Sequence, residues 1–91
     1  MFKIDINLDD ETENENFINT HKTSSGRILA NRLQIKGKGS SKLATSLSGY
    51  AWNKYTAINL RKEGNIQRAK EYEDIADRIY KNDISPVCIC W

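Results

Sequence analysis

A helical period through residues 41–82 constrains the fold of this chain more than any other feature. Apolar side chains recur there at intervals of three and four residues, which places them on one side of a helix. The period breaks at Gly64 and Asn65, where a glycine can end one helix and an asparagine can cap the next. The sequence therefore predicts helices at 41–63 and from 65 to about 82, and so short a turn makes them antiparallel.

The N-terminal part of the chain is less regular. Residues 2–8 alternate apolar and polar side chains, as in a strand with one buried face. Residues 9–25 are rich in Asp, Glu, Asn, Thr and Ser and are expected to form a loop. Residues 26–36 fit a helix and a strand equally, and both remain open. The expected class is mainly α with a small β component: a C-terminal antiparallel αα-hairpin and a short N-terminal strand.

The length of the chain, 91 residues, allows one hydrophobic core, so we expect a single domain over residues 1–91. Residues 1–39 would hold the strand, the acidic loop and a basic segment. Residues 40–82 would form the hairpin, and 83–91 a C-terminal tail after a helix break at Pro86. A domain this small buries only about 60–65% of the surface of its unfolded chain, which makes a homo-oligomer or a bound partner a plausible source of stability.

The sequence shows no membrane or export signal. Its apolar runs fall short of the roughly 20 residues of a membrane helix. The first residues, Met1 to Asp5, lack the apolar stretch of a signal peptide. The expectation is a soluble cytoplasmic protein.

Residues for metal or acid–base chemistry are few. The soft metal ligands are Cys88, Cys90 and His21, and three ligands do not complete a tetrahedral zinc site. His21 stands in a polar stretch with no placed nucleophile or carboxylate beside it. We therefore expect no metal site, no cofactor and no enzymatic activity.

Charge is divided into two blocks. Residues 1–21 carry six acidic side chains and one lysine, whereas residues 22–42 carry six basic side chains and no acid. In one interpretation the acidic arm folds back and pairs with the basic segment. In the other, the basic segment attracts an anion, either a nucleic acid or a nucleotide. The anion-binding side chains would then be Arg27, Arg32, Lys36, Lys38 and Lys42.

Trp52 is the most informative single residue. At 100° per residue it projects onto the flank of its helix with Asn59, beside the apolar stripe rather than on it. A tryptophan there either contacts a partner or is covered by the N-terminal half, and the need of a small domain for every large ring favours cover. Ile75 lies at the edge of a second stripe that is wider than one facing helix can cover. The candidate partner-binding residues are Trp52, Tyr55, Asn59 and Ile75.

The predicted hairpin resembles one tetratricopeptide unit. Gly64, Ala69 and Ala76 have the spacing of the second half of that repeat, and Trp52 stands twelve residues before Gly64. The resemblance covers about a third of the chain and implies a helical hairpin; a superhelical groove needs about three repeats. The proline comes several residues late, and the Leu-Gly pair of the first helix is missing.

The stretches LSGYAWNKYTA at 47–57 and YEDIADRIY at 72–80 are similar to small proteins of tailed bacteriophages that have no known activity. The resemblance implies a phage-derived accessory protein. Our expectation is a non-enzymatic protein that docks on a host protein, and inhibits it, or on a second copy of itself. The alternative is an anion binder for nucleic acid or a nucleotide through residues 22–42.

Overall fold

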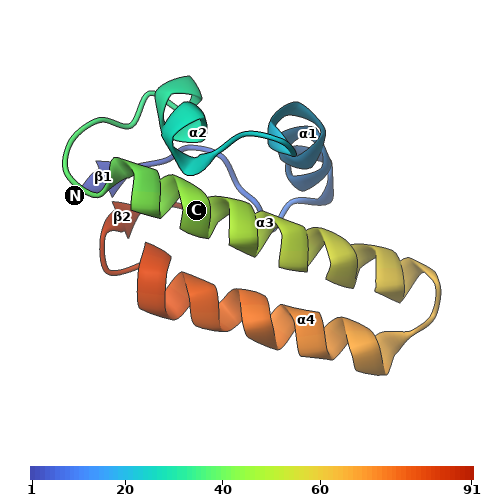
Figure 1. Cartoon of the computed structure of the whole chain (residues 1–91). Coiled ribbons are helices and arrows are strands. Elements are labelled where there is room, and N and C mark those ends of the chain that lie inside the picture. Colours follow the sequence, from blue (N-terminus) through green and yellow to red (C-terminus); the bar gives the residue numbers. More distant parts are fainter.

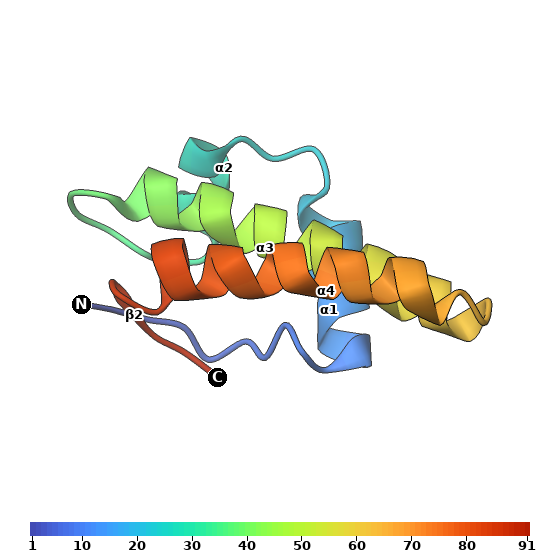
Figure 2. The same cartoon turned by 90° about the horizontal axis from the view of Figure 1, so that it is seen from below.

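Two helices, α3 (Ser40–Lys62) and α4 (Ile66–Ile79), lie side by side along the length of the computed structural model, which describes residues 1–91 (Figures 1 and 2). The chain reverses between them at Gly64, which adopts a φ of +85° that suits a residue without a Cβ. The side chain of Asn65 then accepts a hydrogen bond from the backbone amide of Arg68. Both predicted signals at the helix break, a left-handed glycine and an asparagine cap, are confirmed.

The second helix does not end as an α-helix. Its last turn, η1 (Tyr80–Ile84), is π-helical, and the amide of Ser85 donates to the carbonyl of Tyr80 at 2.7 Å. This wider turn places Ile84 in the core, fully buried, before Pro86 ends the helix. The predicted extent, to about residue 82, was therefore two residues short.

A small parallel sheet joins the two ends of the chain. It consists of β1 (Phe2–Lys3) and β2 (Cys88–Ile89), with Phe2 opposite Cys88. The strand predicted at 2–8 is much shorter than expected, because β2 offers a partner for only a few residues. The predicted alternation is still visible in the burial of Ile4 and Leu8.

The loop predicted at 9–25 is wrong, because residues Glu11–His21 form the helix α1. The side chain of Asp10 caps this helix by accepting a hydrogen bond from the backbone amide of Glu13 at 3.0 Å. Its buried face is narrow and contains one polar residue: Asn14, Phe17 and Ile18.

The ambiguous segment 26–36 begins with a helix, α2 (Gly26–Arg32), capped by the side chain of Ser25. Gly26 allows α2 to approach α3 closely, because a Cβ at this position would lie 2.8 Å from the carbonyl oxygen of Ser41. The segment then turns at Gln34 and extends, so that the strand interpretation applies to none of it.

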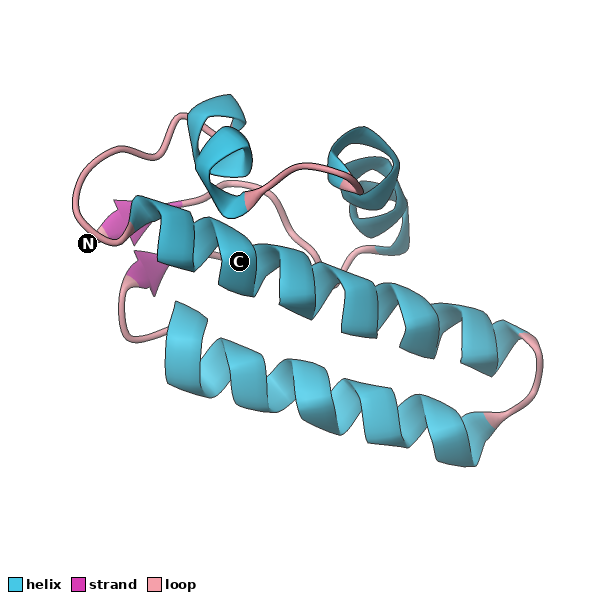
Figure 3. Cartoon of the chain, viewed as in Figure 1, coloured by secondary structure: helices cyan, strands magenta, loops and turns pink.

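The core lies around α3, with α1 and α2 on one side of this helix and α4 on another (Figures 1 and 3). Asn14, the one buried polar residue, ties three segments together. Its side-chain nitrogen donates to the carbonyl of Leu8 at 3.2 Å and to the carbonyl of Ala51 at 3.1 Å. The protein is thus mainly helical with a small β component, as predicted. None of its helices combines the length and the apolar character required to cross a membrane.

Candidate functional site

Trp52 lies on the surface of α3, with 40% of the residue exposed. The expectation that the N-terminal half would cover it is met only in part, since this exposed fraction leaves the residue on the surface. The indole instead rests edge-on against Tyr55, with ring centroids 6.0 Å apart. A large, partly exposed ring therefore stands on a regular helix whose neighbours hold it in place.

Ile75 of α4 lies on the same flank of the hairpin as Trp52. A Cβ placed on Gly49 would lie 3.6 Å from Cδ1 of Ile79, so these two residues face each other across the helix pair. Trp52 follows Gly49 by three residues, and Ile75 precedes Ile79 by four. Side chains three or four residues apart lie on the same side of a helix. Because α3 and α4 run in opposite directions, moving forward along α3 from Gly49 and backward along α4 from Ile79 reaches the same height along the helix pair.

Helical geometry thus places Trp52 and Ile75 on one flank, and Tyr55 and Asn59 are neighbours of Trp52 on α3. Tyr55 is half-buried with its ring perpendicular to the Trp52 indole, and Asn59 follows Tyr55 by one helical turn. Ile75 is 37% exposed, and Tyr72, one turn away on α4, is half-buried. We call this surface the Trp52 face and define it by Trp52, Tyr55, Asn59, Tyr72 and Ile75.

The predicted anion-binding residues do not form one cluster. Lys38 and Lys42 line a small pocket of about 140 Å³ at the start of α3, where Gly39 provides no side-chain cap for the helix. Asp83 lines the same pocket and opposes an anion. Arg32 is engaged elsewhere, since its guanidinium donates to the carbonyl of Thr20 and the hydroxyl of Ser24. Arg27 and Lys36 are exposed and make no hydrogen bond or ion pair through their side chains.

The acidic arm does not fold back onto the basic segment. Its two ion pairs are both made with lysines of α3: Asp9 with Lys54, at 3.7 Å, and Glu11 with Lys62. The pairing of residues 1–21 with residues 22–42, one of the two interpretations of the charge blocks, is therefore wrong. The reason is the unforeseen helix α1, which carries Glu11 beside Lys62, and the segment before its N-cap, which carries Asp9 beside Lys54.

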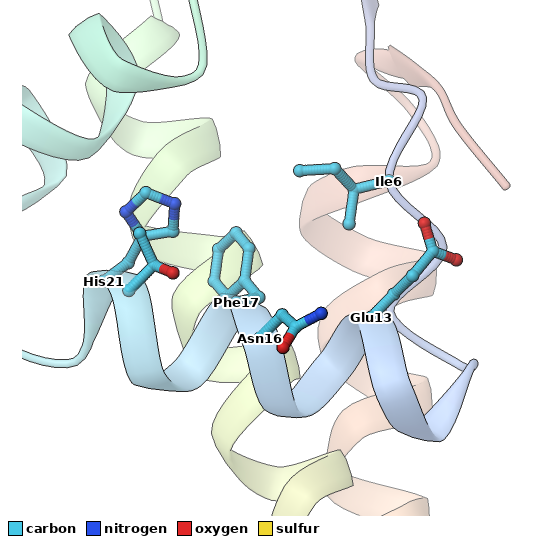
Figure 4. A pocket seen from close by; sticks show the side chains of 6 residues that line it. Ile6, Glu13, Asn16, Phe17 and His21 are labelled. Atoms are coloured by element: carbon cyan, nitrogen blue, oxygen red, sulfur yellow. The ribbon is translucent and has the colours of Figure 1, made fainter.

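His21 lines a shallow pocket on the outer side of α1, together with Ile6, Glu13, Asn16, Phe17 and Thr20 (Figure 4). The imidazole packs edge-on against Phe17, with centroids 4.9 Å apart, and its buried Nδ1 has no hydrogen-bond partner. Burial, followed by the positive charge of Arg32, lowers the pKa of His21 below its usual value of 6.5. In Figure 4 the Phe17 ring lies between His21 and Glu13, so this carboxylate does not face the imidazole.

The lowered pKa of His21 predicts a pH-dependent stability. The unfolded chain binds a proton at higher pH than the folded chain does, so stability is complete above about pH 6.5 and falls as the pH drops through this value towards the folded pKa. Urea denaturation at several pH values between about 5 and 7.5 measures the slope. His21→Gln should flatten it, and equal slopes in both proteins would contradict the assignment.

The two cysteines are free thiols on and beside β2. Burial, followed by a hydrogen bond with Cys90, raises the pKa of Cys88 to about 12 and keeps its thiol protonated. A protonated thiol is a poor metal ligand. His21 lies on α1, away from the sheet, and the chain brings together no group of three or more His, Cys, Asp or Glu side chains that could hold a metal ion.

A second cluster of side chains escaped the sequence analysis. The rings of Tyr50, Tyr80 and Trp91 meet near Asp9 and line a pocket with Asp77. None of these three aromatic residues was singled out from the sequence. The sequence carries no local signal for this cluster, because its members come from separate segments of the chain.

Comparison with known proteins finds no match: no family model, no curated protein and no solved structure aligns with this chain at a significant level. The resemblances to a tetratricopeptide unit and to small phage proteins therefore rest on the residues that suggested them. The functional argument depends on the surface of this chain alone.

Proposed function

We propose that this chain is a non-enzymatic protein-docking module and that the Trp52 face is its contact surface. The observation that supports this most directly is the exposed Trp52 indole beside Ile75 on a two-helix scaffold. Tryptophan and tyrosine are enriched among the residues that dominate binding energy, and such residues act best where packing has already fixed their conformation.

The surroundings of the Trp52 face fit the same proposal. Charged side chains that are exposed on α4 border it, among them Arg68, Glu71 and Arg78. Protein interfaces combine an apolar, aromatic centre with a polar rim of this kind. We propose a protein of a bacterial host as the partner, following the resemblance to phage proteins, and inhibition of that protein by occupation of its surface. A second copy of the chain is the other candidate occupant.

The second candidate function is anion binding at the start of α3. It is favoured by Lys38 and Lys42, which line one pocket beside a helix N-terminus without a side-chain cap. Free backbone amides and the helix dipole attract anions at such a position. Asp83 in the same pocket and the engagement of Arg32 weaken this function relative to protein docking.

Salt dependence separates the two functions. The tagged full chain is used to capture material from a bacterial lysate, with washes at about 50 mM and about 500 mM salt. Docking through the Trp52 face should survive the high-salt wash and the combined substitution of Lys36, Lys38 and Lys42 by Gln. Loss of the captured protein in both cases would favour the anion binder. Failure to capture any protein at either salt concentration, by a chain that sediments as a monomer, would contradict protein docking.

A further inference from the structure

A pocket of about 200 Å³ lies on the side of α3 away from Trp52. Tyr50 and Trp52 are two residues apart in a helix, so their side chains project about 200° apart. The lining comes from the N-terminal segment, α3, α4, η1 and the C-terminal segment: Asp9, Tyr50, Asp77, Tyr80 and Trp91. Figure 2 shows the N-terminal and C-terminal segments passing together below the hairpin, which is how β1 and β2 come to pair.

Three aromatic rings form the apolar part of this pocket. The ring centroid of Tyr50 lies 5.8 Å from that of Tyr80 and 5.4 Å from that of Trp91, and the rings are tilted to each other by 53–54°. Both hydroxyls are held: Tyr50 donates to Asp9, and Tyr80 donates to the backbone carbonyl of Trp91 at 3.2 Å. The rings are therefore fixed without the help of a ligand.

The charged part of the pocket is negative. Asp9 and Asp77 line it, and no basic side chain does. Lys54 approaches Asp9 from outside the lining, at 3.7 Å, whereas Asp77 takes part in none of the three ion pairs of the chain. Both carboxylates act on the Tyr50 phenol. Burial is the main cause of the raised pKa of Tyr50, and the Asp9 hydrogen bond and the charges of Asp9 and Asp77 raise it further.

The combination of ring faces and carboxylates selects the ligand. Aromatic faces attract cations, most strongly for tryptophan, and a neighbouring carboxylate adds Coulomb attraction. A metal ion needs several oxygen ligands, whereas here Asp9 is already engaged by Tyr50 and Lys54 and the rings offer no lone pairs. An anion would be repelled. An organic cation is attracted both by the aromatic rings and by the carboxylates of the pocket.

We propose that this pocket binds an organic cation, the ammonium or guanidinium group of a free amine or of a lysine or arginine side chain. The site is separate from the Trp52 face, so a test that contradicts cation binding leaves the proposed docking function unaffected, and the reverse also holds. Asp77 supplies the unpaired negative charge, and the half-buried rings of Tyr80 and Trp91, packed against the buried Tyr50, supply the accessible aromatic surface.

The test uses Trp91 as the reporter. In a Trp52→Phe background Trp91 is the sole tryptophan of the full chain, and its fluorescence is followed during titration with choline. A neutral isostere of choline, 3,3-dimethyl-1-butanol, is the control ligand. We expect saturable binding of choline and at least about 10-fold weaker binding of the alcohol, because the alcohol lacks the charge that the rings and Asp77 attract. Equal responses to both compounds would overturn the proposal.

A pair of matched variants tests the carboxylate. Asp77→Asn should weaken choline binding about 5-fold or more, whereas Asp74→Asn, on the same helix but outside this pocket, should leave it unchanged. Both residues are exposed, and circular dichroism checks that both variants fold. Choline binding by Asp77→Asn at the strength of the parent chain would overturn the site. N-acetyl-lysinamide and N-acetyl-argininamide, compared with choline, then distinguish a protein side chain from a free amine as the natural source.

Discussion

Replacing Asn14 with alanine is expected to lower the free energy of unfolding by about 2–3 kcal/mol. Asn14 is fully buried, and its side-chain nitrogen donates to the carbonyls of Leu8 and Ala51. The alanine variant leaves the Leu8 carbonyl without this donor and opens a small cavity between α1 and α3. Both effects act on the only polar connection among the N-terminal segment, α1 and α3 in the core. Urea denaturation followed by circular dichroism measures the change.

Asn19 provides the matched control for Asn14. It belongs to the same helix but is exposed and makes no side-chain hydrogen bond, so Asn19→Ala should alter stability by less than about 0.5 kcal/mol. This comparison removes the effect of helix propensity, which is the same for both substitutions. Equal stabilities of the two variants would show that the Asn14 hydrogen bonds contribute nothing net.

The hairpin could be predicted because its information is local. Its apolar period continues for about forty residues, and the break carries both a glycine and an asparagine at the positions that end one helix and start the next. A signal repeated over so many turns depends little on the rest of the chain. The predicted bounds accordingly agree with α3 and α4 to within a few residues.

Helix α1 could not be recognised by its apolar period, because one of the three residues on its buried face is Asn14. A polar residue at a core position removes a third of the expected signal from a helix of 11 residues. The available signal was instead the spacing of Asp10 and Glu13, an acidic N-cap followed three residues later by glutamate. The missed helix also bears on the wrong expectation for the acidic arm, because Glu11 in the first turn of α1 pairs with Lys62 of α3.

The surfaces were predictable only in part. Helical geometry alone places Trp52 beside the apolar stripe, and in the structure the residue is 40% exposed. Whether another element covers that flank depends on where α1 and α2 pack, which no local pattern in the sequence specifies. The aromatic and acidic pocket was even less predictable than the position of Trp52, because Asp9, Tyr50 and Trp91 are far apart in the sequence. Only the completed fold brings them together.

Replacing Trp52 with alanine is expected to weaken partner capture by about 30-fold or more, which corresponds to about 2 kcal/mol. The indole is 40% exposed and lies at the centre of the Trp52 face, so a partner that docks there would lose its largest contact. Stability should fall by only about 1–2 kcal/mol, less than for a fully buried tryptophan, because 40% of the residue already faces solvent. Quantitative capture and urea denaturation of the same preparations separate the two effects.

Two isoleucines of α4 make this test independent of folding. Ile75 is 37% exposed on the Trp52 face, and Ile66 is 42% exposed at the start of the helix, away from that face. Ile75→Asp should abolish capture, because it buries a carboxylate in the apolar centre of the interface, while Ile66→Asp should preserve it. If Trp52→Ala and Ile75→Asp both fold and still capture the partner as the parent chain does, the docking surface lies elsewhere. Equal loss in Ile66→Asp would show that capture follows the general apolar character of the hairpin rather than the Trp52 face.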